Sequence, residues 1–198
     1  MMTLYFIRHA ESEANKKNIL ASQMDYPLSK KGMEDARHIA EKFSVDNRVD
    51  KIISSPLIRA VQTAQPFSDI FNVDIKTNSN LLEQHLGRFS GMTYQDVESE
   101  PHYEHDKTKR WNWEPEGGGE SYRMISDRLK IFFDSLDHEG NDKNILVVSH
   151  AVTLRIIRAL LENTIPKYPV VLAKNGEVWK TEFQGLLNAH VIQSFHYI

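Results

Sequence analysis

The chain contains no cysteine among its 198 residues. Disulfide bonds, catalysis by a thiolate and zinc sites built on cysteine are therefore excluded. The chain also begins without a basic leader ahead of an apolar run, so no signal peptide is expected. Because a chain without disulfides suits a reducing compartment, we expect a soluble protein of the cytoplasm.

Long apolar stretches and a strong charge of one sign are missing as well. No stretch approaches the roughly 20 apolar residues of a membrane-spanning helix. The net charge of −3 provides no basic field for nucleic acid or anionic lipid, so neither is expected as a partner. The hydrophobic content of 40% is enough for one core. We therefore expect a single domain over residues 1–198, present as a monomer or a homodimer.

Patterns typical of strands and of amphipathic helices alternate along the chain. Strands are predicted at 4–7, 51–54, 73–76 and 144–148, and helices at 33–43, 57–71, 122–136 (ending near Gly140) and 151–161. Asn175 and Gly176 predict a hairpin between 169–174 and 177–183, and a last strand is expected over 190–196. This order predicts a three-layer α/β/α sandwich with a mostly parallel central sheet and an antiparallel edge.

Two histidines each stand where a predicted buried strand ends. Arg8 and His9 follow the first strand, and Ser149 and His150 follow the strand at 144–148. In open parallel α/β sheets, ligands bind outside the carboxyl ends of the strands, so we expect the two histidines to be neighbours in space. Imidazoles beside a guanidinium would suit an anion, and phosphate is the anion we expect.

The residue types at these positions fit phosphoryl transfer. A neutral histidine such as His9 can attack phosphorus and carry the phosphoryl group. His150 would then hydrogen-bond the transferring oxygens and offset charge in the transition state. Arg59 falls in the first turn of a helix, where a cation opposes the helix dipole unless an anion lies between them. Ordinary alternatives are histidines that bond only to neighbouring groups, and an ion pair between Arg59 and a carboxylate such as Glu83.

Five segments of the chain, taken in order, resemble the histidine phosphatase superfamily, also called phosphoglycerate-mutase-like, on its phosphatase side. The segments are Leu4–Asn15, Tyr26–Gly32, Ser54–Ala64, Gly118–Ser121 and Val147–His150. Each one alone is a weak signal, whereas five in the family's order are specific. The resemblance spans residues 4 to about 161 and implies the same sandwich fold.

The resemblance also implies a role for individual residues. His9 would be the phosphohistidine nucleophile, and Glu83 would be the proton donor. One carboxyl can protonate the leaving alkoxide and later remove a proton from the attacking water. Arg8, Arg59 and His150 would complete the catalytic set. The residues implied in phosphate or substrate binding are Arg8, Asn15, Ser22, Gln23, Arg59, His150 and Ala151.

The chain departs from the family's pattern at a few positions. Ala10 and Ser22 stand where glycine is commoner, and Ala151 opens a segment that is often rich in glycine. Ser22 and Gln23 are therefore expected to alter substrate contacts. Residues 99–119 are polar, aromatic and contain proline and glycine. We interpret them as an excursion that, by the resemblance, would cover the pocket as a lid.

The sequence thus predicts a metal-independent phosphomonoester hydrolase that acts on a small phosphorylated metabolite through phospho-His9. No dissociable cofactor is expected. His102 and His105 alone lack a third ligand, so no metal site is expected. A phosphoglycerate-type mutase is the alternative activity, although familiar mutases of this family are longer between the second arginine and the second histidine. A non-catalytic module that binds phosphorylated ligands is a third hypothesis. The presence of His9, Glu83 and His150 argues against it, because binding alone needs neither a nucleophile nor a proton donor.

Overall fold

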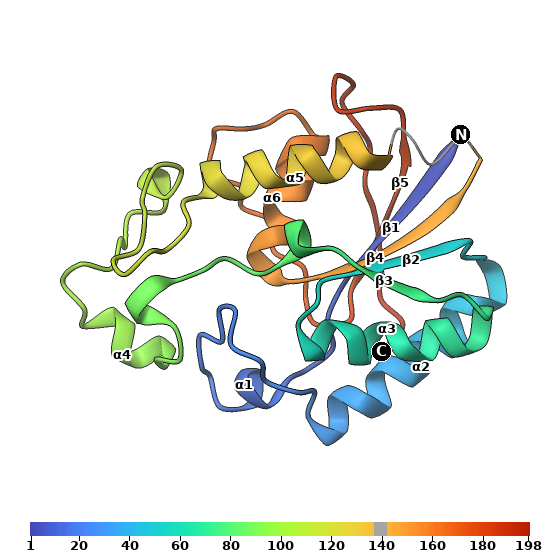
Figure 1. Ribbon diagram of the computed structural model, residues 1–198, viewed down its shortest axis with the longest axis horizontal. Helices are drawn as coiled ribbons and strands as arrows, with labels where there is room; N and C mark the ends of the chain where they lie inside the picture. Colours follow the sequence, from blue (N-terminus) through green and yellow to red (C-terminus); the bar gives the residue numbers. More distant parts are fainter. Residues whose placement is uncertain (137–141) are drawn as a thin grey trace.

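The computed structural model describes residues 1–136 and 142–198. A six-stranded sheet runs through the middle of the molecule and has helices on both faces (Figure 1). The strands are β1 (Met2–Arg8), β2 (Lys51–Ser54), β3 (Ile75–Thr77), β4 (Asn144–Ser149), β5 (Val178–Phe183) and β6 (Gln193–Phe195). The helices are α1 (Glu13–Lys16), α2 (Lys30–Asp46), α3 (Ile58–Phe71), α4 (Tyr94–Glu98), α5 (Tyr122–Leu136) and α6 (Ala151–Leu161).

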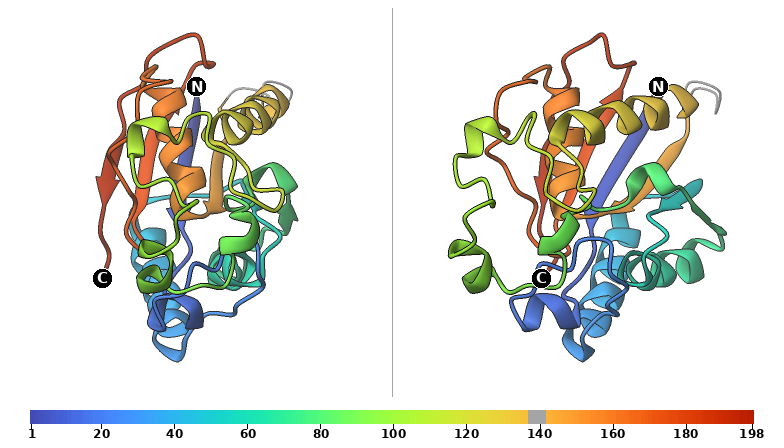
Figure 2. Two further views of the ribbon diagram at one scale, coloured as in Figure 1. Left: turned by 90° about the vertical axis from the view of Figure 1, so that its left-hand side faces the viewer. Right: turned by 60° about the vertical axis from the view of Figure 1, so that its left-hand side comes forward.

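The strand order is β3-β2-β4-β1-β5-β6. The first four strands in this order are parallel, β5 is antiparallel to β1, and β6 is antiparallel to β5. α5 and α6 cover one face of the sheet and α2 and α3 cover the other, a separation that Figure 2 shows from two further directions. The predicted sandwich, with its mostly parallel sheet and antiparallel edge, is confirmed.

The central strands contribute to both cores because successive side chains of a strand point to opposite faces. In β1, Leu4 and Phe6 pack with α5 and α6, whereas Tyr5 and Ile7 pack with α2 and α3. All four side chains are at most 4% exposed. A strand buried on both faces is apolar along its whole length, which explains the uninterrupted run that identified β1 in the sequence.

Most predicted elements form close to their expected positions. α2 begins after Ser29, whose hydroxyl accepts the N–H of Gly32 at 3.0 Å as an N-cap. α6 has the predicted bounds, while β3 begins two residues later than expected and β6 is shorter. The expected end of the fifth helix near Gly140 lies outside the described residues. Across the ranges 1–136 and 142–198, no helix has both the length and the apolar character needed to cross a membrane.

The predicted hairpin at Asn175 and Gly176 is wrong. A turn is present there, because the N–H of Glu177 donates to the carbonyl of Lys174 at 3.0 Å. The preceding residues 169–174 form no strand, however. β5 already has β1 on one edge and β6 on the other, so no edge is left for a partner from that segment.

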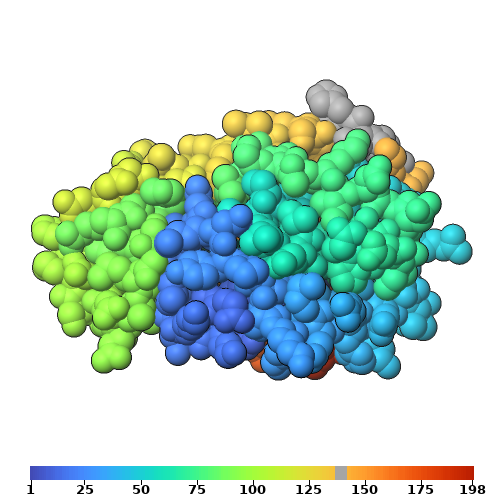
Figure 3. All heavy atoms as spheres, turned by 60° about the horizontal axis from the view of Figure 1, so that its bottom comes forward, coloured from blue at the N-terminus to red at the C-terminus, as the bar shows by residue number. Residues whose placement is uncertain are grey.

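The excursion at 99–119 lies beside the sheet and packs with the chain just before it. Tyr103 and Trp113 contact a small cluster of apolar side chains that includes Leu86 and Phe89. The chain before the excursion is joined to the loop after β1, since the N–H of Leu20 donates to the carbonyl of Met92 at 2.8 Å. Figure 3 shows these two parts of the surface, blue and yellow-green, in direct contact.

The start of α2 packs tightly against the loop that follows β1. A Cβ atom added at Gly32 would lie 1.9 Å from the backbone oxygen of Glu11. We expect Gly32→Ala to lower the free energy of unfolding by about 1–3 kcal/mol, measured by urea denaturation. Lys30→Ala, at an exposed position of the same turn, should change it by less than about 0.5 kcal/mol. Similar values for the two variants would contradict this close packing.

Candidate active site

The two strand-end histidines lie side by side. β1 and β4 pair in parallel with Arg8 opposite Ser149, so the next residues, His9 and His150, leave the sheet at the same edge. Their ring centroids are 5.2 Å apart. His9 is 4% exposed and His150 is fully buried. The proximity expected from the strand ends is present in the structure.

One ring nitrogen of His9 is bound to the backbone. Nδ1 lies 2.7 Å from the carbonyl oxygen of Ala10. Because a carbonyl can only accept, Nδ1 carries the proton and donates it, and Nε2 keeps its lone pair. Burial, followed by the charges of Arg8 and Arg59, lowers the pKa of His9 well below its ordinary value of 6.5. His9 is therefore a neutral imidazole whose Nε2 has a free lone pair.

His150 is bound at one nitrogen and unpartnered at the other. Its Nε2 lies 2.7 Å from the hydroxyl of Ser55. Its Nδ1 is buried and meets no hydrogen-bond partner in the described part of the chain. Burial is the largest cause that lowers the pKa of His150 well below 6.5, and Arg59 adds to it. A buried nitrogen without a partner costs about 1–3 kcal/mol, which a bound oxyanion could relieve.

The two arginines are bound mainly through backbone oxygens. Arg59 is 1% exposed, and its two terminal nitrogens donate to the carbonyls of Ser22 and Met24, each at 2.7 Å. Arg8 donates to the carbonyl of Ala173 at 2.7 Å, and its Nε is buried with no hydrogen-bond partner among the residues that the structure describes. Neither guanidinium forms an ion pair with a described residue, so the alternative of an Arg59–Glu83 pair is not seen. Their charge is available to an anion.

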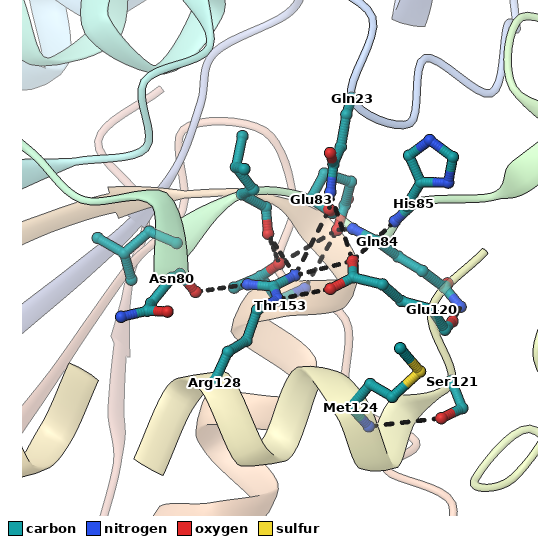
Figure 4. A network of polar contacts seen from close by, with 12 residues as sticks. Gln23, Asn80, Glu83, Gln84, His85, Glu120, Ser121, Met124, Arg128 and Thr153 are labelled. Carbon is teal, nitrogen blue, oxygen red and sulfur yellow. Dashed lines mark hydrogen bonds and ion pairs between the residues drawn. The ribbon is translucent and has the colours of Figure 1, made fainter. Parts of the chain in front are cut away.

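The carboxylate of Glu83 is held by the first turn of α6. It accepts the N–H groups of Val152 and Thr153, each at 3.2 Å, and that of Gln84 at 2.9 Å. Figure 4 shows Glu83 and Thr153 facing each other, and the Thr153 hydroxyl donates to the carbonyl of Leu82 at 2.6 Å. The helix N-terminus favours a carboxylate here. Glu83 also lines the cavity that contains His9.

The cavity between these side chains measures about 90 Å³. A water molecule in the liquid occupies ~30 Å³, so this volume corresponds to roughly three water molecules. It is lined by residues from four parts of the chain: Arg8, His9, Ser12, Asn15, Ile19, Leu20, Ala21, Ser22, Arg59, Glu83, Gln84, Leu86, Tyr94, Ala151 and Val152. The space suits a phosphoryl group, while a larger leaving group would extend out of it.

The predicted binding residues divide into two groups. Asn15, Ser22 and Ala151 line the cavity together with Arg8 and Arg59, whereas His150 is not among the residues that line it. Ser22 has φ +48°, in the left-handed region that favours glycine, which explains why glycine is commoner at this position. Gln23 lies outside the cavity wall, and its side-chain amide donates to the carbonyl of Glu83 at 2.9 Å. A direct substrate contact from Gln23 stays a prediction.

A short loop separates His9 from the first helix. α1 begins only at Glu13, with Ser12 as its N-cap, and is one turn long. Asn175 holds this loop by two hydrogen bonds, because its side-chain amide donates to the carbonyl of His9 at 2.9 Å and to Asn15 Oδ1 at 3.2 Å. The sequence showed Asn175 only as a turn residue.

Sequence reasoning also missed Ser55 and Tyr94. Ser55 could have been found, because it follows β2 at the same sheet edge as His150. Tyr94 lines the cavity from the chain before the excursion and has no local signal of its own. Among residues 1–136 and 142–198, no group of three or more histidine, aspartate or glutamate side chains could hold a metal ion.

The chain matches the family model described as histidine phosphatase superfamily (branch 1) over residues 4–186. It is 32% identical to phosphoserine phosphatase 1 of Hydrogenobacter thermophilus over 165 residues, which cover 81% of this chain and 76% of that protein. It is 29% identical to phosphoglycerate mutase-like protein 4 of Arabidopsis thaliana over 163 residues, covering 81% and 70% of the two chains.

Solved structures share the fold. A mycobacterial glucosyl-3-phosphoglycerate phosphatase superposes with a TM-score of 0.81 at 23% identity, covering 90% of this chain and 89% of that one. A phosphoserine phosphatase from Entamoeba histolytica, solved with 3-phosphoglyceric acid, gives a TM-score of 0.83 at 24% identity, covering 98% and 96%.

The lowered histidine pKa values predict how stability depends on pH. Below about pH 6.5 the unfolded chain protonates His9 and His150 while the native protein keeps them neutral, so the unfolded state binds more protons. Each such proton lowers the free energy of unfolding by about 1.4 kcal/mol per pH unit of acidification. We expect His150→Gln to lose stability less steeply than the parent between about pH 6.5 and about pH 5 in urea denaturation. Equal slopes would contradict a buried, neutral His150.

Proposed function

Because the chain belongs to the histidine phosphatase superfamily, we propose that it hydrolyses phosphomonoesters through a phosphoryl group carried on His9. The observation that supports this most directly is the state of the His9 ring. Its Nδ1–H donates a hydrogen bond to the carbonyl of Ala10, so Nε2 is the ring nitrogen with a free lone pair, and His9 lines a small cavity together with two guanidiniums and one carboxylate. A neutral imidazole with a fixed tautomer is a nucleophile that needs no further activation.

The proposed reaction has two transfers. In the first, Nε2 of His9 attacks phosphorus, the ester P–O bond breaks, and the carboxylic acid form of Glu83 gives its proton to the departing alkoxide and becomes the carboxylate. In the second, water attacks the phosphohistidine, Glu83 takes the water's proton, and the P–N bond breaks to release phosphate. Arg8, Arg59 and the free Nδ1 of His150 would bind the phosphoryl oxygens as their charge shifts in each transition state.

The substrate we propose is a small phosphorylated metabolite. Relatives of the chain are named as phosphoserine phosphatase and glucosyl-3-phosphoglycerate phosphatase, so phosphoserine and phosphoglycerate-type esters are the first compounds to test. Other relatives are named as phosphoglycerate mutases, and the assay below separates the two activities. A lid role for residues 99–119, a single domain over 1–198, a cytoplasmic location and a monomeric or homodimeric state stay predictions.

We expect the purified protein to release inorganic phosphate from p-nitrophenyl phosphate and from phosphoserine in the presence of EDTA. A mutase would interconvert phosphoglycerates after priming with a bisphosphoglycerate and release little phosphate. His9→Ala should abolish release, because the nucleophile is lost, while His38→Ala, at an exposed position on α2, should keep it. Acid-labile phosphate trapped on the protein by rapid quench, and absent in His9→Ala, would identify the intermediate. Full activity in His9→Ala would overturn the proposal.

Glu83→Gln should affect substrates according to their leaving groups. The amide oxygen can still accept one of the N–H groups of α6, but the amide cannot supply a proton. We expect kcat/KM for phosphoserine to fall roughly 10²- to 10⁴-fold. The fall should be much smaller for p-nitrophenyl phosphate, whose phenolate leaves without protonation. Unchanged hydrolysis of phosphoserine would rule out Glu83 as the acid.

A further inference from the structure

Arg128 of α5 reaches toward the segment that carries Glu83 (Figure 4). Its guanidinium donates to the backbone carbonyl of Asn80 and to that of Leu82, the latter at 2.7 Å. It also forms a bidentate ion pair with Glu120, with distances of 2.9 Å to Oε1 and 3.3 Å to Oε2. One side chain thus bonds both to the backbone before Glu83 and to a carboxylate.

Glu120 binds the same segment from its other end. Its Oε2 accepts the N–H of His85 at 2.9 Å and lies 3.4 Å from the side-chain nitrogen of Gln23. Its backbone carbonyl accepts the side-chain N–H of Gln84 at 2.7 Å, and its own N–H donates to the carbonyl of His85 at 2.8 Å. Arg128 and Glu120 therefore hold the residues on both sides of Glu83.

This segment depends on side-chain contacts because residues 82–86 belong to no helix or strand. Without ladder hydrogen bonds, the backbone here takes its geometry from the groups that bind its carbonyls and N–H groups. The side chains of Arg128 and Glu120 are 15% and 17% exposed. Paired charges that are this well covered, with bidentate geometry, are stronger and more directional than a surface ion pair.

The same pair is linked to the phosphate side of the cavity. Gln23, which lies against Glu120, donates to the carbonyl of Glu83 at 2.9 Å. The neighbouring carbonyls of Ser22 and Met24 are the ones that accept from Arg59. Glu120 thus connects the loop that Arg59 binds to the segment that carries the proton donor.

From these contacts we infer that Arg128 and Glu120 are a positioning pair that sets where the Glu83 carboxyl stands relative to the phosphoryl group. The inference rests on the proposed hydrolase function, in which Glu83 protonates the leaving alkoxide. Neither residue lines the cavity, so they act through Glu83 and Gln23. A shift of about 1 Å in a catalytic group can cost roughly 100-fold in rate.

The test compares two substrates in Arg128→Lys. Lysine keeps the charge but offers no planar fork, so it cannot bind two carbonyls and a carboxylate together. We expect kcat/KM for phosphoserine to fall roughly 10- to 100-fold. For p-nitrophenyl phosphate, which needs no proton donor, the fall should stay under about threefold, and competitive inhibition by inorganic phosphate should be unchanged. Equal falls for both substrates would overturn the inference.

A second ion pair of the chain serves as the matched control. Arg158 of α6 pairs with Glu162 at 2.8 Å, with side chains 20% and 32% exposed, and within the described residues it forms no hydrogen bond or ion pair with residues 82–86. Arg158→Lys should leave the ratio of the two kcat/KM values as in the parent. A similar change of ratio in this variant would show that any loss of a partly buried ion pair has this effect.

Combination with Glu83→Gln decides whether Arg128 acts through Glu83. Added to Glu83→Gln, the Arg128→Lys change should cost less than about twofold more on phosphoserine, because the donor is already lost. A full further loss would overturn the inference. If Arg128→Lys does not fold, as judged by its thermal transition, the same comparisons are made with Glu120→Gln, whose amide oxygen can still accept the N–H of His85. A parent protein that hydrolyses neither substrate would instead reject the proposed function itself.

Discussion

The site depends on the register between two parallel strands. β1 and β4 pair so that Arg8 stands opposite Ser149, and the residues after them are the two histidines. A slip of one residue would turn every side chain of β1 to the other face of the sheet, with Leu4 and Phe6 moving out of their core. The two hydrophobic cores therefore enforce the 5.2 Å approach of the imidazoles, and the geometry of the site is maintained by the same packing that maintains the fold.

The charge distribution complements this geometry. Two guanidiniums lie at the cavity and give their hydrogen bonds to backbone carbonyls, which leave the positive charge in place. Burial of the two rings, followed by the field of the arginines, keeps His9 and His150 neutral. A dianionic phosphoryl group would compensate the guanidinium charge and supply the partner that the Nδ1 of His150 lacks. The uncompensated guanidinium charge and the unpartnered nitrogen of His150 are thus costs that binding of a phosphoryl group would relieve.

The sequence allowed the parts with local signals to be predicted. Apolar runs that end in polar residues identified β1 and β4, and with them the pairing of His9 with His150. The hairpin prediction failed because β5 pairs with β1 and β6, and the turn residues Asn175 and Gly176 carry no information about these distant partners. The network around Glu83 joins Arg128 to residues more than 40 positions earlier, such as Leu82. Contacts of this kind follow from tertiary packing and leave no periodic pattern in the chain.

The small size of the cavity separates the reacting group from the rest of the substrate. Space of about 90 Å³ admits the part of the ester that every phosphomonoester shares. Whatever distinguishes one ester from another must contact the chain around the cavity, near lining residues such as Leu86 and Tyr94. Mutations in that surrounding chain can therefore change the substrate specificity of the enzyme during evolution while the reaction at phosphorus is retained.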